Sequence, residues 1–203
     1  GTFSEQGTLD ATAKSGGITI VAGQKLSGYG TVNLASGATI TVDGTIAPGN
    51  SPGVMNVDGN LVLAGTAVME VNGNRAAGAA DGYDRIDVTG NLTYGGVLNI
   101  VINSSTTRSY SEANIFQNTI FTSSVDSGNF IAVNLSGTAG YSASLIYYGA
   151  NNTWQFWDNA DEYYAGINLD TGILTLIPEP STYGLFGLGA VAIGFALRRR
   201  RKA

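Results

Sequence analysis

Short runs of alternating apolar and polar residues recur through the first half of this chain. They cover residues 18–21, 31–34, 38–42, 54–57, 61–63 and 67–71, and each run is closed by Gly, Asn or Asp. Alternation of this kind between turn-forming residues indicates strands. No window of eleven or more residues before residue 178 shows a helical stripe with caps. The sequence therefore predicts an all-β body.

Two internal repeats narrow the architecture. The pattern Val-Xaa-Gly begins at residues 42, 57, 71 and 88, so its steps are 15, 14 and 17 residues. A longer echo aligns 57–72 with 88–103 at an offset of 31, with identity at six of sixteen positions. Repeating units of about 20 to 50 residues built from short strands favour a solenoid, in which each turn covers the apolar face of the next. A β-sandwich with similar short strands is the alternative.

The solenoid makes a specific prediction about the echo. Val57 and Val88 should occupy equivalent inward positions on nearby turns, and so should Leu61 and Leu92. Because the pattern is already under way in residues 1–30 and Gly1 is not an initiator Met, we expect the chain to begin partway through a longer protein.

Three segments of residues 16–103 resemble the autotransporter-associated β-strand repeat. They are Gly44-Thr-Ile-Ala-Pro-Gly-Asn-Ser-Pro-Gly53, Val57-Asp-Gly-Asn-Leu61, and Tyr83-Asp84 leading into Ile86-Asp-Val-Thr-Gly90. The resemblance implies a right-handed parallel β-helix. The Pro- and Gly-rich segment 44–53 is predicted to be a rigid bend outside any central ladder, turning the chain between rungs. The membrane β-barrel that ends a true autotransporter has no counterpart in this pattern, so self-transport does not carry over.

Residues 104–177 lack the repeat but still contain strand-like runs, at 115–121, 130–135, 144–148, 153–157 and 173–177. Aromatic residues are concentrated there. A solenoid needs an end cap, because its last turn would otherwise expose an apolar face and an unpaired edge. We therefore expect three regions: β-solenoid repeats in 1–103, an irregular, aromatic-rich β end cap in 104–177, and a separate C-terminal segment in 178–203.

The C-terminal segment has three parts in order. Pro178-Glu179-Pro180 is followed by 181–197, which contains no charged residue, and then by the basic cluster Arg198, Arg199, Arg200, Arg201 and Lys202. Seventeen residues give about 25 Å of helix, slightly less than a hydrocarbon core of about 30 Å. We expect a single transmembrane α-helix whose basic end stays cytoplasmic, which places residues 1–177 outside the cytoplasm.

These three parts resemble the PEP-CTERM sorting signal of Gram-negative bacteria. The resemblance implies export, transient anchoring in the inner membrane, and processing by an exosortase, a membrane protease or transpeptidase found with exopolysaccharide systems. After processing the protein would lie at the cell surface or outside the cell. The alternative is a plain C-terminal membrane anchor with a proline linker.

Composition excludes several functions. The chain contains neither Cys nor His, which removes thiolate and histidine metal sites and the Ser-His and Cys-His nucleophilic systems. Residues 1–177 hold five basic and fourteen acidic residues, a net charge of 5 − 14 = −9, so nucleic acid is not an expected partner. No cofactor is expected.

Three groups of polar and aromatic residues are candidate sites. Asp81, Asp84 and Asp87 could supply oxygens to calcium, but a polar loop leading into a strand explains them better. Asp158, Asp161 and Glu162 could act on a glycoside, although such closely spaced acids favour a turn. Trp157, Tyr163 and Tyr164 could form a platform on which a sugar ring packs. Alternation in a strand predicts that Trp154 and Phe156 pack inward while Trp157 points the other way.

These observations predict an exported, non-enzymatic structural protein of the cell surface or extracellular matrix, associated with exopolysaccharide or biofilm. A carbohydrate-binding module acting on exopolysaccharide is the alternative. A β-helical polysaccharide lyase or hydrolase is a more distant one.

Overall fold

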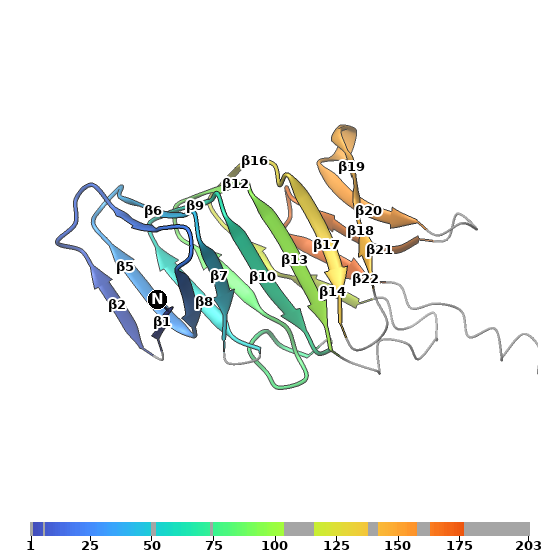
Figure 1. Cartoon of the computed structure of the whole chain (residues 1–203), viewed down its shortest axis with the longest axis horizontal. Coiled ribbons are helices and arrows are strands. Elements are labelled where there is room, and N and C mark those ends of the chain that lie inside the picture. Colours follow the sequence, from blue (N-terminus) through green and yellow to red (C-terminus); the bar gives the residue numbers. More distant parts are fainter. Residues whose placement is uncertain are drawn as a thin grey trace, which may run out of the picture.

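The fold comes from a computed structural model that describes residues 2–5, 7–49, 52–73, 75–103, 116–137, 142–157 and 163–176. In these ranges the regular structure is β-strand, apart from a single 3-10 turn at Gly149–Asn151. The strands form four sheets: two have only parallel pairs, a third is parallel except for its last pair, and the fourth is antiparallel (Figure 1). The predicted all-β body is therefore confirmed.

Successive strands visit the three parallel sheets in a fixed rotation, which winds the chain into a coil. Sheet B contains β15-β11-β8-β5-β2, sheet C contains β16-β12-β9-β6-β3, and sheet A contains β1-β4-β7-β10-β13-β17-β18. Each turn of the coil runs from B through C to A. This arrangement is compatible with a parallel β-helix, and its right-handed sense stays a prediction.

The described coil has five turns, preceded by β1 (Thr2–Glu5) on sheet A. The turns are β2 (Thr8–Ala11), β3 (Ile18–Ile20) and β4 (Lys25–Gly28); β5 (Gly30–Leu34), β6 (Thr39–Val42) and β7 (Thr45–Pro48); β8 (Val54–Asp58), β9 (Asn60–Leu63) and β10 (Thr66–Val71); β11 (Arg85–Val88), β12 (Asn91–Tyr94) and β13 (Val97–Ile102); β15 (Phe121–Thr122), β16 (Val125–Gly128) and β17 (Ala132–Ser136).

Alternation decides which side chains fill the coil. In β10, Ala67, Met69 and Val71 are buried while the residues between them are half-buried. Met69 pairs with Ile100 of β13, which is also fully buried, so equivalent side chains stack along the coil. Burying such side chains contributes about 1.5 to 3 kcal/mol each relative to exposure, which explains why a chain with few charges folds this way.

The 31-residue echo corresponds to one turn of the coil. Val57 pairs with Val88 and Leu61 pairs with Leu92, and all four side chains are buried. The predicted equivalence is confirmed. The Val-Xaa-Gly pattern has a different meaning, because its valines lie at the last or next-to-last position of strands on sheets C, B, A and B in turn. Its steps of 14 to 17 residues therefore mark corners of the coil and not whole turns.

The predicted exclusion of segment 44–53 from the ladder is wrong for its first half. Thr45, Ile46 and Ala47 form the body of β7, which lies between β4 and β10 in sheet A. Each of these residues has an amide to donate, and the first two are β-branched, so they suit a central strand. The chain leaves the ladder only after Pro48, where the ring removes a donor. From there on, the segment is the bend that the sequence predicts.

The coil continues beyond residue 103, where the repeat in the sequence ends. Strands β15, β16 and β17 pair in parallel with β11, β12 and β13. Here the turn lengthens, since Val97 pairs with Ala132 at a separation of 132 − 97 = 35 residues. Aromatic side chains also enter the core at Phe121 and Phe130. Both changes conceal the turn from a search for sequence repeats.

An antiparallel sheet, sheet D, lies at the C-terminal end of the coil (Figure 1). A short strand, β18 (Ala143–Ser144), pairs with β17 and leads into it. The strands of sheet D, in spatial order, are β14 (Phe116–Thr119), β22 (Ile173–Leu176), β21 (Tyr163–Asn168), β20 (Thr153–Trp157) and β19 (Ile146–Tyr148).

One hydrophobic core runs through the coil and into sheet D. Where the two meet, the Tyr94 ring lies 5.6 Å from that of Phe121 and 5.1 Å from that of Phe130. The Trp154 indole N–H donates to Asn129 Oδ1 at 2.7 Å. Trp154 is buried and Phe156 packs partly buried against the core, as their alternation predicts.

The expected transmembrane helix, residues 181–197, lies outside the described residues. So do Pro178-Glu179-Pro180 and the basic cluster Arg198, Arg199, Arg200, Arg201 and Lys202. Within the part of the chain that the structure does describe, no helix is long and apolar enough to cross a membrane.

Candidate functional site

The aromatic residues predicted as a sugar platform come from two neighbouring strands of sheet D. Trp157 is the last residue of β20 and pairs with Tyr163, where β21 begins, while Tyr164 follows. Only the backbone is described at these three positions, so the direction of their rings stays a prediction. Asp158, Asp161 and Glu162, which were weighed for glycoside chemistry, lie outside the described residues.

The three aspartates considered for calcium have separate partners. Asp81 forms an exposed ion pair with Arg75, at 2.8 Å, and Asp87 forms a half-buried ion pair with Arg85, also at 2.8 Å. The Asp84 carboxyl group takes part in neither ion pair; it is buried and accepts hydrogen bonds from two backbone amides. Across the described ranges, no three acidic side chains gather as a metal site would require. The polar-loop interpretation accounts for Asp81 and Asp87 but not for Asp84.

Asp84 connects two of the segments on which the autotransporter-repeat resemblance was based. Its Oδ1 accepts the Gly53 amide at 2.7 Å, and its Oδ2 accepts the Glu70 amide at 2.8 Å. The side chain is 1% exposed. One carboxylate therefore ties the Pro-Gly bend to β10 and to the start of β11, across 31 residues of sequence.

The bend that Asp84 holds needs glycine at both ends. Gly49 has φ +80°, and a Cβ placed on Gly53 would overlap the backbone of Gly49. Only glycine allows two backbone segments to approach this closely. The close approach of Gly49 and Gly53 and the buried carboxylate together fix the position of Gly53 just before β8.

Burial outweighs these hydrogen bonds in setting the acidity of Asp84. Loss of solvent raises the pKa of the carboxyl from 3.8 to about 7, the two backbone amides act in the opposite direction, and the nearby Glu70 charge raises it further. Glu70 Oε2 is itself buried and has no hydrogen-bond partner in the described structure.

Glu70 and Asp84 also line a hollow of about 210 Å³ on the outer side of sheet A, together with Lys25. Two carboxyl groups in one hollow could suggest glycoside hydrolysis, which needs an acid and a second carboxylate on opposite sides of the scissile bond. Both oxygens of Asp84 are engaged by backbone amides, and its side chain is almost fully enclosed. Asp84 is therefore placed to support the fold and not to reach a substrate.

The connections from sheet A to sheet B grow along the coil. After the two-residue link 6–7 between β1 and β2, these connections are the single residue Tyr29, then 49–53, then 72–84, and then 103–120, which includes β14. Connections at the other two corners do not lengthen along the coil: the longest is 12–17, in the first turn. In repeat proteins, insertions that collect on one side often form the binding face. This corner, between sheets A and B, is therefore where a partner is best sought.

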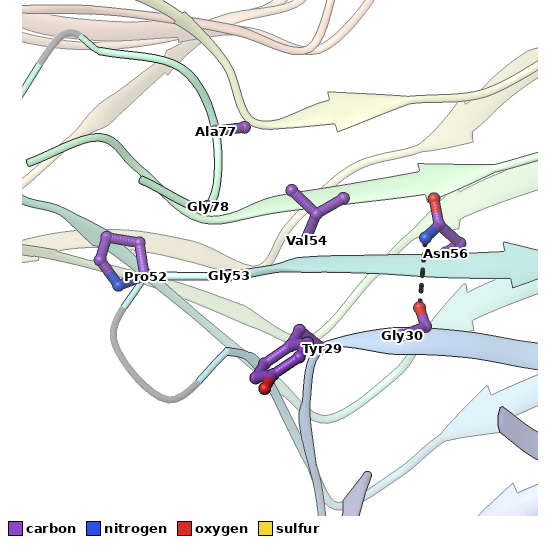
Figure 2. Close-up of a pocket in the computed structure, with 8 residues that line it drawn as sticks. All are labelled: Tyr29, Gly30, Pro52, Gly53, Val54, Asn56, Ala77 and Gly78. Carbon is purple, nitrogen blue, oxygen red and sulfur yellow. Dashed lines mark hydrogen bonds between the residues drawn. The ribbon is translucent and has the colours of Figure 1, made fainter. Parts of the chain in front are cut away.

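A groove of about 460 Å³ lies at this corner; we call it the corner groove (Figure 2). Three connections contribute its walls: 29–30 at the start of β5, 52–54 with Asn56 at the start of β8, and 77–78 in the longest described loop. Its volume falls within the range of about 300 to 1,000 Å³ that is typical of small-molecule sites.

The lining of the corner groove combines one aromatic ring, small apolar groups and an amide. Tyr29 is 46% exposed, and Figure 2 shows its ring beside the path of Pro52 and Gly53. The Asn56 side chain donates from Nδ2 to the Gly30 carbonyl at 3.2 Å. Its Oδ1 has no partner among the described residues and remains able to accept. No lining residue that the structure describes carries a formal charge.

Neither the groove residues Tyr29 and Asn56 nor the role of Asp84 was predicted from the sequence. Tyr83-Asp84 and the Pro-Gly bend were visible as motifs, but their contact depends on the register of the coil. Tyr29 gave a weaker signal, a lone aromatic residue between two glycines. Nothing in the sequence alone shows that it faces residues 52–54 and 77–78.

Comparison with known proteins identifies one feature. Residues 176–201 match the PEP-CTERM protein-sorting motif. No curated protein matches the chain, and no solved structure matches it. The match covers the Pro-Glu-Pro sequence, the apolar stretch and the four arginines. It indicates an exported, membrane-anchored precursor that an exosortase processes.

Proposed function

We propose that this chain is a structural protein of the cell surface or extracellular matrix, delivered there through its C-terminal signal. The observation that carries the proposal is the match of residues 176–201 to the PEP-CTERM protein-sorting motif. Exosortase, a membrane enzyme, is the partner that this motif implies. The apolar residues 181–197 hold the precursor at the inner membrane until cleavage, and the basic cluster keeps its end cytoplasmic.

The body acts as a scaffold without catalytic activity. We propose that it is a right-handed β-helix of the autotransporter-repeat type, closed at its C-terminal end by sheet D. The parallel sheets and continuous core support this role, because a solenoid presents a long, regular surface on a rigid support. After processing, the protein resides at the surface of a Gram-negative cell and associates with exopolysaccharide or biofilm. An acidic body, with a net charge of 5 − 14 = −9, fits this role better than nucleic-acid binding.

Mass spectrometry of the protein from producing cells tests the sorting step. We expect the dominant species to end near residue 180, because proline disfavours helix in the residue before it and so favours the extended backbone that a protease-like groove accepts. Replacing Pro178, Glu179 and Pro180 together by Ala should leave chains that end at Ala203. A double variant, Ser181→Ala with Thr182→Ala, keeps the motif and serves as the matched control. Intact chains as the dominant parent species would leave only the plain-anchor alternative.

The corner groove favours a second candidate, a carbohydrate-binding module. An exposed tyrosine beside an amide and small apolar groups can hold a ring that has both apolar and hydroxyl-bearing surfaces. The two candidates are compatible, because a matrix scaffold that binds polysaccharide would use such grooves for attachment.

A further inference from the structure

We infer that the corner groove binds a neutral saccharide, with Tyr29 as the platform for a sugar ring and Asn56 as its hydrogen-bonding partner. The inference rests on the proposed association with exopolysaccharide and gives it a site. This site is distinct from the aromatic platform of Trp157, Tyr163 and Tyr164 on sheet D.

The position of the groove is the first argument. It lies where the connections lengthen, and three of its walls come from segments that are far apart in sequence. One wall of the groove consists of residues 52–53. The hydrogen bond from Gly53 to Asp84 and the close approach of Gly49 and Gly53 hold this wall in place, so it is formed before any ligand arrives. A preformed wall lowers the entropy lost on binding.

The charge of the groove selects the class of saccharide. The described lining carries no charged side chain, while the body around it has a net charge of −9. An acidic polysaccharide would be repelled by this body and would find no cation in the groove to pair with. A neutral sugar meets neither obstacle, because its hydroxyl groups need only polar partners.

The chemistry of the two side chains matches a sugar ring. Tyr29 offers a rigid, amphipathic surface that loses little conformational entropy on binding. Asn56 Nδ2 is held by the Gly30 carbonyl, which fixes the amide and leaves Oδ1 to accept a hydroxyl proton. Val54, two residues before Asn56 on β8, lines the groove on the side of Gly78 and adds apolar contact (Figure 2).

Affinity electrophoresis of the full chain in mild detergent tests the inference, with dextran and mannan as neutral polymers and polygalacturonate as the acidic one. We expect retention by at least one neutral polymer, and a loss of at least about tenfold in Tyr29→Ala, equivalent to about 1.4 kcal/mol. Tyr29→Phe keeps the ring and should retain most binding. The matched control is Tyr148→Ala, whose side chain is 43% exposed on β19. Thermal melting checks that each variant is folded.

The outcomes separate this inference from the proposed function. If Tyr29→Ala binds as well as the parent while Trp157→Ala does not, the corner groove inference fails and the sugar-binding role stands. If the parent prefers polygalacturonate, the neutral-saccharide assignment is overturned. If the parent binds none of the polymers, the groove inference and the polysaccharide association both fall, whereas sorting through the C-terminal signal is decided by mass spectrometry alone.

Discussion

At the scale of single residues, the burial of the Asp84 carboxyl group is the most unusual feature of the described structure. A carboxyl group is rarely buried unless it is paired, and this one is stabilised only by two backbone amides. Its position makes the bend at 49–53 depend on the start of β11, one turn further along the coil. The wall of the corner groove depends on it for the same reason.

The raised pKa of Asp84 predicts a pH-dependent stability. Because the folded-state pKa, about 7, lies above the ordinary value of 3.8, the folded protein holds this proton more tightly than the unfolded chain does. The stabilisation is fully present below about pH 4 and is lost as the pH rises through about 7. We expect the free energy of unfolding to fall by about 1 to 4 kcal/mol between about pH 4 and about pH 8.

Denaturant unfolding of the parent and of Asp84→Asn at several pH values measures this effect. The variant lacks the titrating group, so its stability should change less over the same range, although it replaces one acceptor by a donor. Asp81→Asn removes an exposed ion pair and should leave the pH profile of the parent intact. A parent that becomes more stable between about pH 5 and about pH 8 would contradict the argument.

At the scale of strands, sequence reasoning succeeded where alternation is strong. The runs at 54–57, 61–63 and 153–157 are strands within a residue of the predicted bounds. The alternation pattern did not predict β4 (Lys25–Gly28), which has one apolar residue, Leu26, and pairs with a parallel strand on each side. Such a strand is determined by the coil around it more than by its own residues, which is why local pattern could not reveal it.

Leu61 tests the inward face of the coil. It is fully buried on β9, between β6 and β12. We expect Leu61→Ala to lower the free energy of unfolding by about 2 to 5 kcal/mol, through lost transfer energy and the cavity left behind. Val62, the next residue, points outward and is half-buried, so Val62→Ala is the matched control and should have a smaller effect. Equal losses in the two variants, measured by denaturant unfolding, would rule out the inward assignment of Leu61.

At the scale of the whole molecule, a repeat in the sequence predicted the coil but not its extent. The echo between 57–72 and 88–103 gave the correct register, because the paired strands in these two segments keep a constant offset of 31 residues. It failed to reveal β15, β16 and β17, whose turn is longer and is filled by aromatic side chains. The antiparallel order of sheet D, and the groove formed by three distant connections, depend on tertiary contacts that no local pattern encodes.

The final prediction concerns how far sheet D supports the coil. Trp154 on β20 is 7% exposed, its ring lies 5.3 Å from the tilted ring of Tyr147, and it donates to Asn129, so its removal should loosen the contact between the sheet and the last turn. We expect Trp154→Ala to cost about 3 to 5 kcal/mol and to lower the melting temperature markedly. Tyr148→Ala, on the exposed edge strand, is the control and should change it little.

Hydrogen exchange can identify the strands that lose stability in Trp154→Ala. In a solenoid each turn contacts only its neighbours, so the effect should decay along the coil, with β17 losing protection first, then β13, and β5 least. The rings of Tyr94, Phe121 and Phe130 carry the coupling, because they join the last two turns where the sheet covers them. If sheet D alone loses protection and β17 keeps its own, the sheet is a separate unit beside the coil, and the proposal that it caps the coil must be abandoned.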